Sequence, residues 1–92
     1  MDTRTAFAHA LRRVRKARNM SQESFEGVAS RAYVSALERA QKNPTLAMIE
    51  AMSEAMDVHP LTILLATYAA KHPRIPPEEL MERALTELKS LP

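Results

Sequence analysis

The fold is decided by residues 21–45, SQESFEGVASRAYVSALERAQKNPT, which predict two short helices separated by an abrupt turn around Gly27–Ser30. The second helix opens at Ser30, whose hydroxyl can accept a hydrogen bond from a free backbone N–H of the first turn. It ends before Asn43-Pro44, because the residue before a proline is disfavoured in helical geometry. Two apposed helices joined by a tight turn are the unit with which a small protein lays one helix in the major groove of DNA.

The rest of the chain also carries helical patterns. It contains a single glycine, is rich in helix-forming residues and shows no sustained period-two alternation, so an all-α fold is expected. Apolar residues spaced by three and four positions predict helices over residues 5–18, 46–56 and 60–70. Pro77 followed by two acids favours the start of a last helix, because proline suits the first helical turn and acids are stabilised there. Together with the two short helices, the pattern predicts six helices.

The proline-rich segment HPRIPP at residues 72–77 divides the chain into two expected parts. Residues 1–71 would form a five-helix domain, and residues 72–92 a linker with a C-terminal helix that dimerises or binds a partner. A chain of 92 residues buries only about 60–70% of the surface that its unfolded form exposes, so a second subunit would add to its stability. The net charge is only +2, but residues 1–20 hold six cations and one acid, an asymmetry that favours contact with phosphate.

Two pieces of the deciding stretch, SALER at residues 35–39 and KNPTL at residues 42–46, resemble the Cro/C1-type (xenobiotic-response-element) helix-turn-helix family. Lambdoid phage repressors and restriction–modification controller proteins belong to this family. The resemblance covers residues 7–65, where SQE, LER, NPTL and MDVHPLTILL follow one another in the family's order. It implies a five-helix, lambda-repressor-like DNA-binding domain, to which this chain adds a sixth, C-terminal helix. The segment from Ser21 to Glu38 is shorter than the family pattern, which predicts a trimmed first helix or turn in this unit.

The start of the second helix of this unit supplies the candidate base contacts. Base edges in the major groove are reached by side chains at the start of a recognition helix and one turn later, here Arg31, Ala32, Ser35 and Ala36. Arg31 is the one long donor, and a guanidinium can bond O6 and N7 of guanine together, which discriminates against a wrong base by about 1–3 kcal/mol. The two alanines offer only methyl groups, so much of the specificity is expected from dimer spacing and DNA shape.

Contacts to DNA phosphate have more candidates. The resemblance implies that Gln22 touches the DNA backbone and that the loop after the second helix follows the same strand. Arg15 and Glu38 match positions that form a buried ion pair in the phage repressors, so they are expected to brace two helices and not to touch DNA. The full set of expected phosphate contacts is Arg18, Gln22, Ser30, Tyr33, Arg39, Lys42 and Asn43.

The helix over residues 60–70 carries more apolar side chains than one small core can cover. A surplus apolar face usually marks a partner surface, and a second copy of the chain is the simplest partner. A twofold dimer would place two recognition helices about 34 Å apart, one turn of the duplex. In the alternative, the C-terminal helix folds back and covers the same face within one subunit. The expected interface consists of Leu61, Leu64, Leu65, Tyr68, Leu85 and Leu88.

Several classes of function are disfavoured by what the chain lacks. It has no cysteine and no glycine-rich phosphate loop, and its serines lie mostly at helix starts, where capping explains them. His9, His59 and His72 are scattered, without acids at ligand spacing. Enzymatic activity, a metal site and a cofactor are therefore not expected. No apolar run approaches the roughly 18–20 residues of a membrane span, so a soluble cytoplasmic protein is expected.

The patterns and the resemblance lead to one functional hypothesis. The chain is expected to be a sequence-specific, double-stranded-DNA-binding transcriptional regulator with the helix around residues 30–39 in the major groove. It would act as a repressor, as a homodimer on a near-palindromic operator. One alternative is an antitoxin that binds DNA and neutralises a toxin through its C-terminal helix. Another is a protein-interaction module that binds a different protein with the last two helices.

Overall fold

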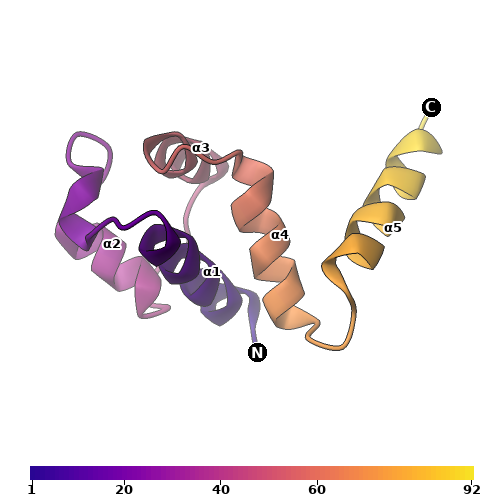
Figure 1. The fold of residues 1–92 in the computed structure, drawn as a ribbon, viewed down its shortest axis with the longest axis horizontal. Helices are drawn as coiled ribbons and strands as arrows, with labels where there is room; N and C mark the ends of the chain where they lie inside the picture. Colours follow the sequence, from indigo (N-terminus) through magenta and orange to yellow (C-terminus); the bar gives the residue numbers. More distant parts are fainter.

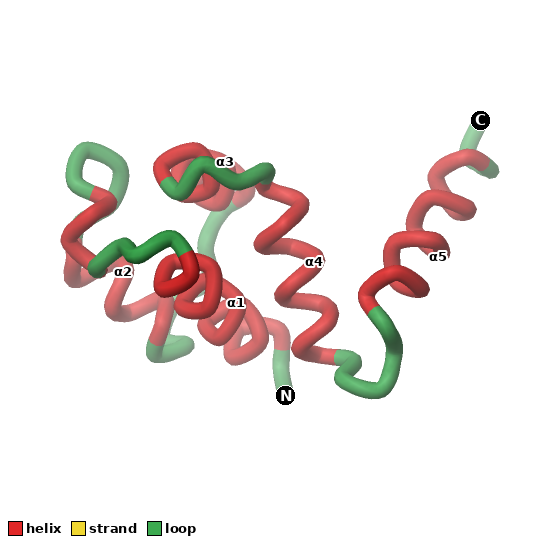
Figure 2. The backbone as a smooth tube through the Cα atoms, viewed as in Figure 1, coloured by secondary structure: helices red, strands yellow, loops and turns green.

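The computed structural model describes residues 1–92 and contains helices but no strands, so the expected all-α class is confirmed (Figure 1 and Figure 2). The expected count of six helices is wrong, because the short helix expected after Ser21 is a single 3-10 turn. The C-terminal helix expected as the sixth is therefore the fifth α-helix. The elements are α1 (Thr3–Ala17), the 3-10 turn η1 (Gln22–Phe25), α2 (Arg31–Glu38), α3 (Leu46–Ala55), α4 (Pro60–Lys71) and α5 (Pro77–Lys89).

The shortness of η1 follows from the residues at its two ends. At its start the Ser21 N–H donates to Ser24 Oγ over 2.9 Å, a local bond that competes with helical hydrogen bonds. After its end Gly27 takes a φ of 87°, a left-handed value that glycine adopts without steric cost and that turns the chain back. Phe25, between them, is fully buried and anchors the turn in the core. The connection from η1 to α2 is therefore abrupt, as the sequence predicted.

The hydrophobic core is built around α1, which lies between α2 and α4 (Figure 1) and packs against both. The apolar stripe predicted for α1, Phe7, Leu11 and Val14, is buried there. Helix α2 is held by one face only, and its other face is left at the surface. The remaining members of the core are Ala10, Phe25, Val34, Leu37, Ile49, Met52, Met56 and Ile63.

Helix α5 stands apart from this core. It has no buried residue, and in Figure 1 it projects away from the body of the molecule after the linker at residues 72–76. Near its start it contacts α4, where Leu80 and Met81 are half-buried. The alternative in which this helix covers the apolar face of α4 holds only in part, because Leu61 and Tyr68 of α4 stay exposed.

No helix of this chain combines the length and the hydropathy that crossing a bilayer demands. No group of three or more His, Asp or Glu side chains lies close enough together to hold a metal ion.

Candidate nucleic-acid interface

The exposed face of α2 is the centre of the candidate interface. Ser30 caps the helix, because its Oγ accepts a hydrogen bond from the Tyr33 N–H over 3.1 Å. The opposite face of α2 lies in the core, which fixes the direction in which the remaining side chains point. Three of the expected base contacts reach the surface in this way: Arg31 and Ala32 are exposed and Ser35 is half-buried.

The burial of Ala36 does not support its expected base contact. Only 8% of its surface is exposed, and its neighbour Leu37 is fully buried. A methyl group inside the domain cannot meet a base edge. The spacing of one turn after Ala32 suggested a surface position, but packing turns this part of α2 toward the core. The candidates for base contact are therefore Arg31, Ala32 and Ser35.

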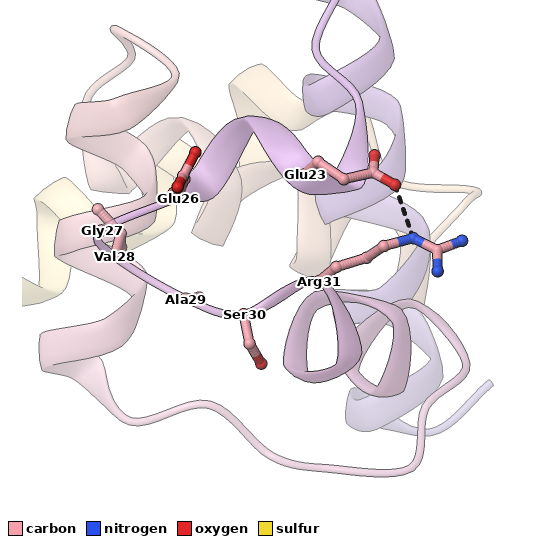
Figure 3. A pocket seen from close by; sticks show the side chains of 7 residues that line it. All are labelled: Glu23, Glu26, Gly27, Val28, Ala29, Ser30 and Arg31. Carbon is pink, nitrogen blue, oxygen red and sulfur yellow. Dashed lines mark ion pairs between the residues drawn. The ribbon is translucent and has the colours of Figure 1, made fainter.

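Arg31 forms an ion pair that the sequence did not reveal. Its Nε lies 2.7 Å from Glu23 Oε1, and the two side chains are 68% and 61% exposed (Figure 3). The pKa of Glu23 lies below its ordinary value, because hydrogen bonds from its own backbone N–H and from the Ser21 side chain stabilise the carboxylate and Arg31 adds an opposite charge. The sequence did not predict the partnership of Glu23 with Arg31, because ion pairs across an irregular turn have no characteristic spacing.

Cations gather at the other end of α2. Lys42 Nζ lies 5.6 Å from the centroid of the Tyr33 ring, in reach of a cation–π interaction. Arg39 Nη2 donates to Gln41 Oε1 over 3.2 Å, which leaves the rest of its guanidinium free to bond elsewhere. Arg39 and Lys42 are both exposed. Positive charge therefore stays at the surface beside Tyr33, as a phosphate contact requires.

Asn43 links the loop after α2 to the start of α1. Its Oδ1 accepts a hydrogen bond from Arg4 Nε over 3.2 Å, between residues 39 positions apart. The side-chain amide of Asn43 keeps its two N–H donors for an external acceptor. Arg4 thus joins the cations of this loop, although the sequence placed it only within a basic N-terminal run. No local pattern could have assigned it to this surface, because the fold alone brings the two segments together.

Two expected phosphate contacts are engaged inside the protein. Gln22 Nε2 donates to Glu38 Oε1 over 3.3 Å, since the short η1 turns this amide toward α2. Arg18 Nε donates to the Met56 carbonyl over 2.8 Å, and its Nη2 donates to the Asp57 carbonyl over 3.1 Å. These bonds hold the C-terminal end of α3 next to the C-terminal end of α1. The structure therefore favours a bracing role for Gln22 and Arg18 in place of the expected phosphate contacts.

Arg15 and Glu38 tie α1 to α2 beneath the candidate interface. Arg15 Nε lies 2.6 Å from Glu38 Oε2, and Arg15 Nη2 donates to Glu38 Oε1 over 2.8 Å. Arg15 Nη1 donates to the Met20 carbonyl over 2.8 Å. Hydrogen bonding to Glu38 raises the pKa of Arg15 above its ordinary value, although burial opposes this. The side chains are only 10% and 4% exposed, so this pair ties α2 to α1 and is largely covered by the protein.

The residues expected to form a dimer interface surround the junction of α4 and α5. A hollow of about 470 Å³ lies there, with Leu61, Leu64, Leu65 and Tyr68 of α4 among its lining residues. Leu85 lines a neighbouring hollow of about 590 Å³ that also includes Leu65. Leu88 lies farther along α5 and is 64% exposed. Five of the six expected residues therefore line two adjoining hollows at this junction, and Leu88 lines neither of them.

A short turn packed against an exposed, capped helix, with cations beside the far end of that helix, defines a helix-turn-helix DNA-binding domain. The family model described as Helix-turn-helix matches residues 11–63, more than half of the chain. The chain therefore belongs to the Cro/C1-type helix-turn-helix family, as its motifs predicted, and is a DNA-binding transcriptional regulator. No curated protein and no solved structure matches the chain significantly.

Proposed function

We propose that this regulator represses transcription by binding a near-palindromic double-stranded operator as a homodimer, with α2 in the major groove. The observation that carries this proposal is the exposed start of α2, where the Arg31 side chain is 68% exposed and extends from the helix (Figure 3). Arg31, Ala32 and Ser35 would meet base edges. The flanking phosphates would be contacted by Arg4, Ser30, Tyr33, Arg39, Lys42 and Asn43.

Binding to duplexes selected from a random pool tests the role of α2. Affinity should fall steeply between about 50 and 200 mM salt, because phosphate contacts release counterions. Arg31→Ala should relax discrimination at one base position by about 1–3 kcal/mol, whereas Lys42→Ala should weaken all duplexes alike. Arg74→Ala removes the same charge from an exposed residue of the linker between α4 and α5 and serves as the matched control. Equal effects of the three variants would contradict an α2 bound in the groove.

The homodimer is supported by the apolar surface at the junction of α4 and α5. Leu61 at this junction and Leu88 farther along α5 are more than half exposed, and a second copy would remove both from water. Leu61→Glu and Leu88→Glu should halve the mass measured by sedimentation equilibrium and weaken operator binding. Leu46→Glu places the same charge on an exposed leucine of α3 and should leave the mass unchanged. A wild-type chain that stays monomeric while bound to the operator would exclude the homodimer.

The projection of α5 favours a second candidate function, that of an antitoxin. A helix without a buried residue is available to another protein, and its apolar stripe suits an apolar groove. Removing residues 77–92 separates the two candidates. If the shortened chain keeps its dimer and its operator affinity, α5 is free for a partner such as a toxin. If the shortened chain is a monomer, α5 forms part of the dimer interface. If the complete chain retains no duplex at all, a protein-interaction module using α4 and α5 replaces both.

A further inference from the structure

An acid lies where the proposed interface should be basic. Glu23 stands at the start of the exposed turn η1, and its carboxylate is held 2.7 Å from Arg31 Nε. In Figure 3 the two terminal nitrogens of the guanidinium point away from the carboxylate. Only the Nε side of Arg31 is therefore engaged within the protein, and the edge formed by Nη1 and Nη2 remains free.

The pair exists because the connection between η1 and α2 is short. Gly27 turns the chain back at a φ of 87°, and Ser30 already caps α2 three residues later. The segment from Glu23 to Arg31 surrounds an open hollow of about 510 Å³ and places both charges on its rim (Figure 3).

Neither the stability contributed by the ion pair nor general DNA affinity explains why this carboxylate is paired with Arg31. Both side chains of the pair are mostly exposed, and exposed ion pairs contribute little to folding. A negative charge beside DNA repels phosphate and weakens binding to every sequence. The pKa of Glu23 is lowered by its local hydrogen bonds and by Arg31, so its surroundings favour the charged carboxylate.

A role in orienting the Arg31 side chain does explain the position of the Glu23 carboxylate. Arginine loses considerable side-chain freedom when it binds, and a partner that restricts it beforehand reduces this loss. The free edge offers two N–H donors side by side, which match the O6 and N7 acceptors of guanine.

We propose that Glu23 is a positioning residue for base recognition: it holds Arg31 from the Nε side so that the Nη1–Nη2 edge faces one guanine of the operator. This role rests on the function proposed above, because it requires α2 to lie in the major groove. Glu23 itself would not touch the base.

The full-length chain tests this role with two variants and a matched control. Glu23→Ala removes the carboxylate, and Glu23→Gln keeps an amide oxygen near Arg31 Nε without the charge. Glu26→Gln removes the same charge from the exposed residue that directly follows η1 and that forms no ion pair. Affinity is measured for the selected operator, for the same operator with 7-deazaguanine at the position that Arg31→Ala identifies, and for a random duplex.

The ratio of affinities for guanine and 7-deazaguanine is the decisive quantity. Glu23→Ala should reduce this ratio about two- to fivefold, the effect expected of an exposed ion pair, and Glu23→Gln should reduce it less. Glu26→Gln should leave the ratio unchanged, while all three variants bind random duplex slightly more tightly. An unchanged ratio in Glu23→Ala would overturn the positioning role, and an increased ratio would show instead that Glu23 withholds Arg31 from DNA. If the wild-type chain does not distinguish its selected duplex from a random one, the proposed function fails, and the role of Glu23 fails with it.

Discussion

Replacing Glu38 by alanine should remove about 3 kcal/mol of stability. The Glu38 carboxylate holds the Arg15 guanidinium at 2.6 and 2.8 Å, and the two side chains are only 4% and 10% exposed. Removing one partner of a buried ion pair typically costs about 3–5 kcal/mol, because the other charge stays buried without a counterion. Arg15 keeps its bond to the Met20 carbonyl and a little access to water, so the lower end of that range applies.

This loss is large for a chain of 92 residues. At about 0.05–0.15 kcal/mol per residue, its total stability is about 5–14 kcal/mol. A change of 1 kcal/mol shifts the midpoint of thermal unfolding by about 4–8 °C in a domain of this size, so Glu38→Ala should lower the midpoint by about 12–24 °C. Urea unfolding followed by circular dichroism measures the free energy, and its slope should stay that of the wild type because the surface exposed on unfolding is nearly the same.

Two comparison variants check the reasoning about Glu38. Glu87→Ala breaks the exposed pair that Glu87 forms with Arg83 at 3.5 Å and should cost less than about 0.5 kcal/mol. Arg15→Met combined with Glu38→Leu replaces both charges by apolar side chains and should recover most of the stability, since no charge is left buried. A Glu38→Ala midpoint within a few degrees of the wild type would refute the burial of the pair. A double variant less stable than Glu38→Ala would refute the assumed cost of the lone charge.

Three further predictions concern backbone geometry and capping. Ala40→Gly should raise the free energy of unfolding by about 1 kcal/mol, because Ala40 has a φ of 58° at the end of α2, a conformation unfavourable to a residue with a Cβ; a destabilised variant would contradict this geometry. Gly27→Ala should lower the free energy of unfolding by about 1 kcal/mol, because a residue with a Cβ is strained at the positive φ of Gly27. The new Cβ would meet no atom within 4 Å, so the backbone conformation alone causes this loss. Unchanged stability in urea would exclude the positive φ. Asp2→Ala should lower the thermal midpoint at neutral pH, because Asp2 Oδ1 accepts a hydrogen bond from the Thr5 N–H over 2.8 Å. That bond lowers the pKa of Asp2 in the folded chain. The stabilisation by Asp2 is therefore complete above its ordinary pKa of 3.8 and is lost as the pH falls below this value. A difference between Asp2→Ala and the wild type that persists at low pH would disprove this cap.

The parts of the candidate interface that depend on neighbouring residues could be predicted from the sequence. Ser30 was expected as a cap because an N-cap bonds a backbone N–H two or three residues later, and the structure has this bond. The partners of long charged side chains could not be predicted in this way. Gln22 and Arg18 can reach phosphate in principle, but their actual acceptors come from α2 and from the end of α3. Arg4 was not expected at the candidate interface, because its partner Asn43 lies 39 residues away in the chain and only the fold brings the two together.

The sequence by itself determined the helical class, the abrupt turn before α2, the apolar stripe of α1 and the membership of a helix-turn-helix family. The first three depend on residues within one or two helical turns of each other, because helical hydrogen bonds and side-chain periodicity have that range. The family membership depends on several such short motifs that follow one another along residues 11–63. Only the tertiary structure decided that Ala36 is buried while Ala32 is exposed, and that α5 remains largely uncovered. The reason is that burial is set by contacts between segments distant in the chain, and a helix of eight residues such as α2 takes most of its stability from those contacts.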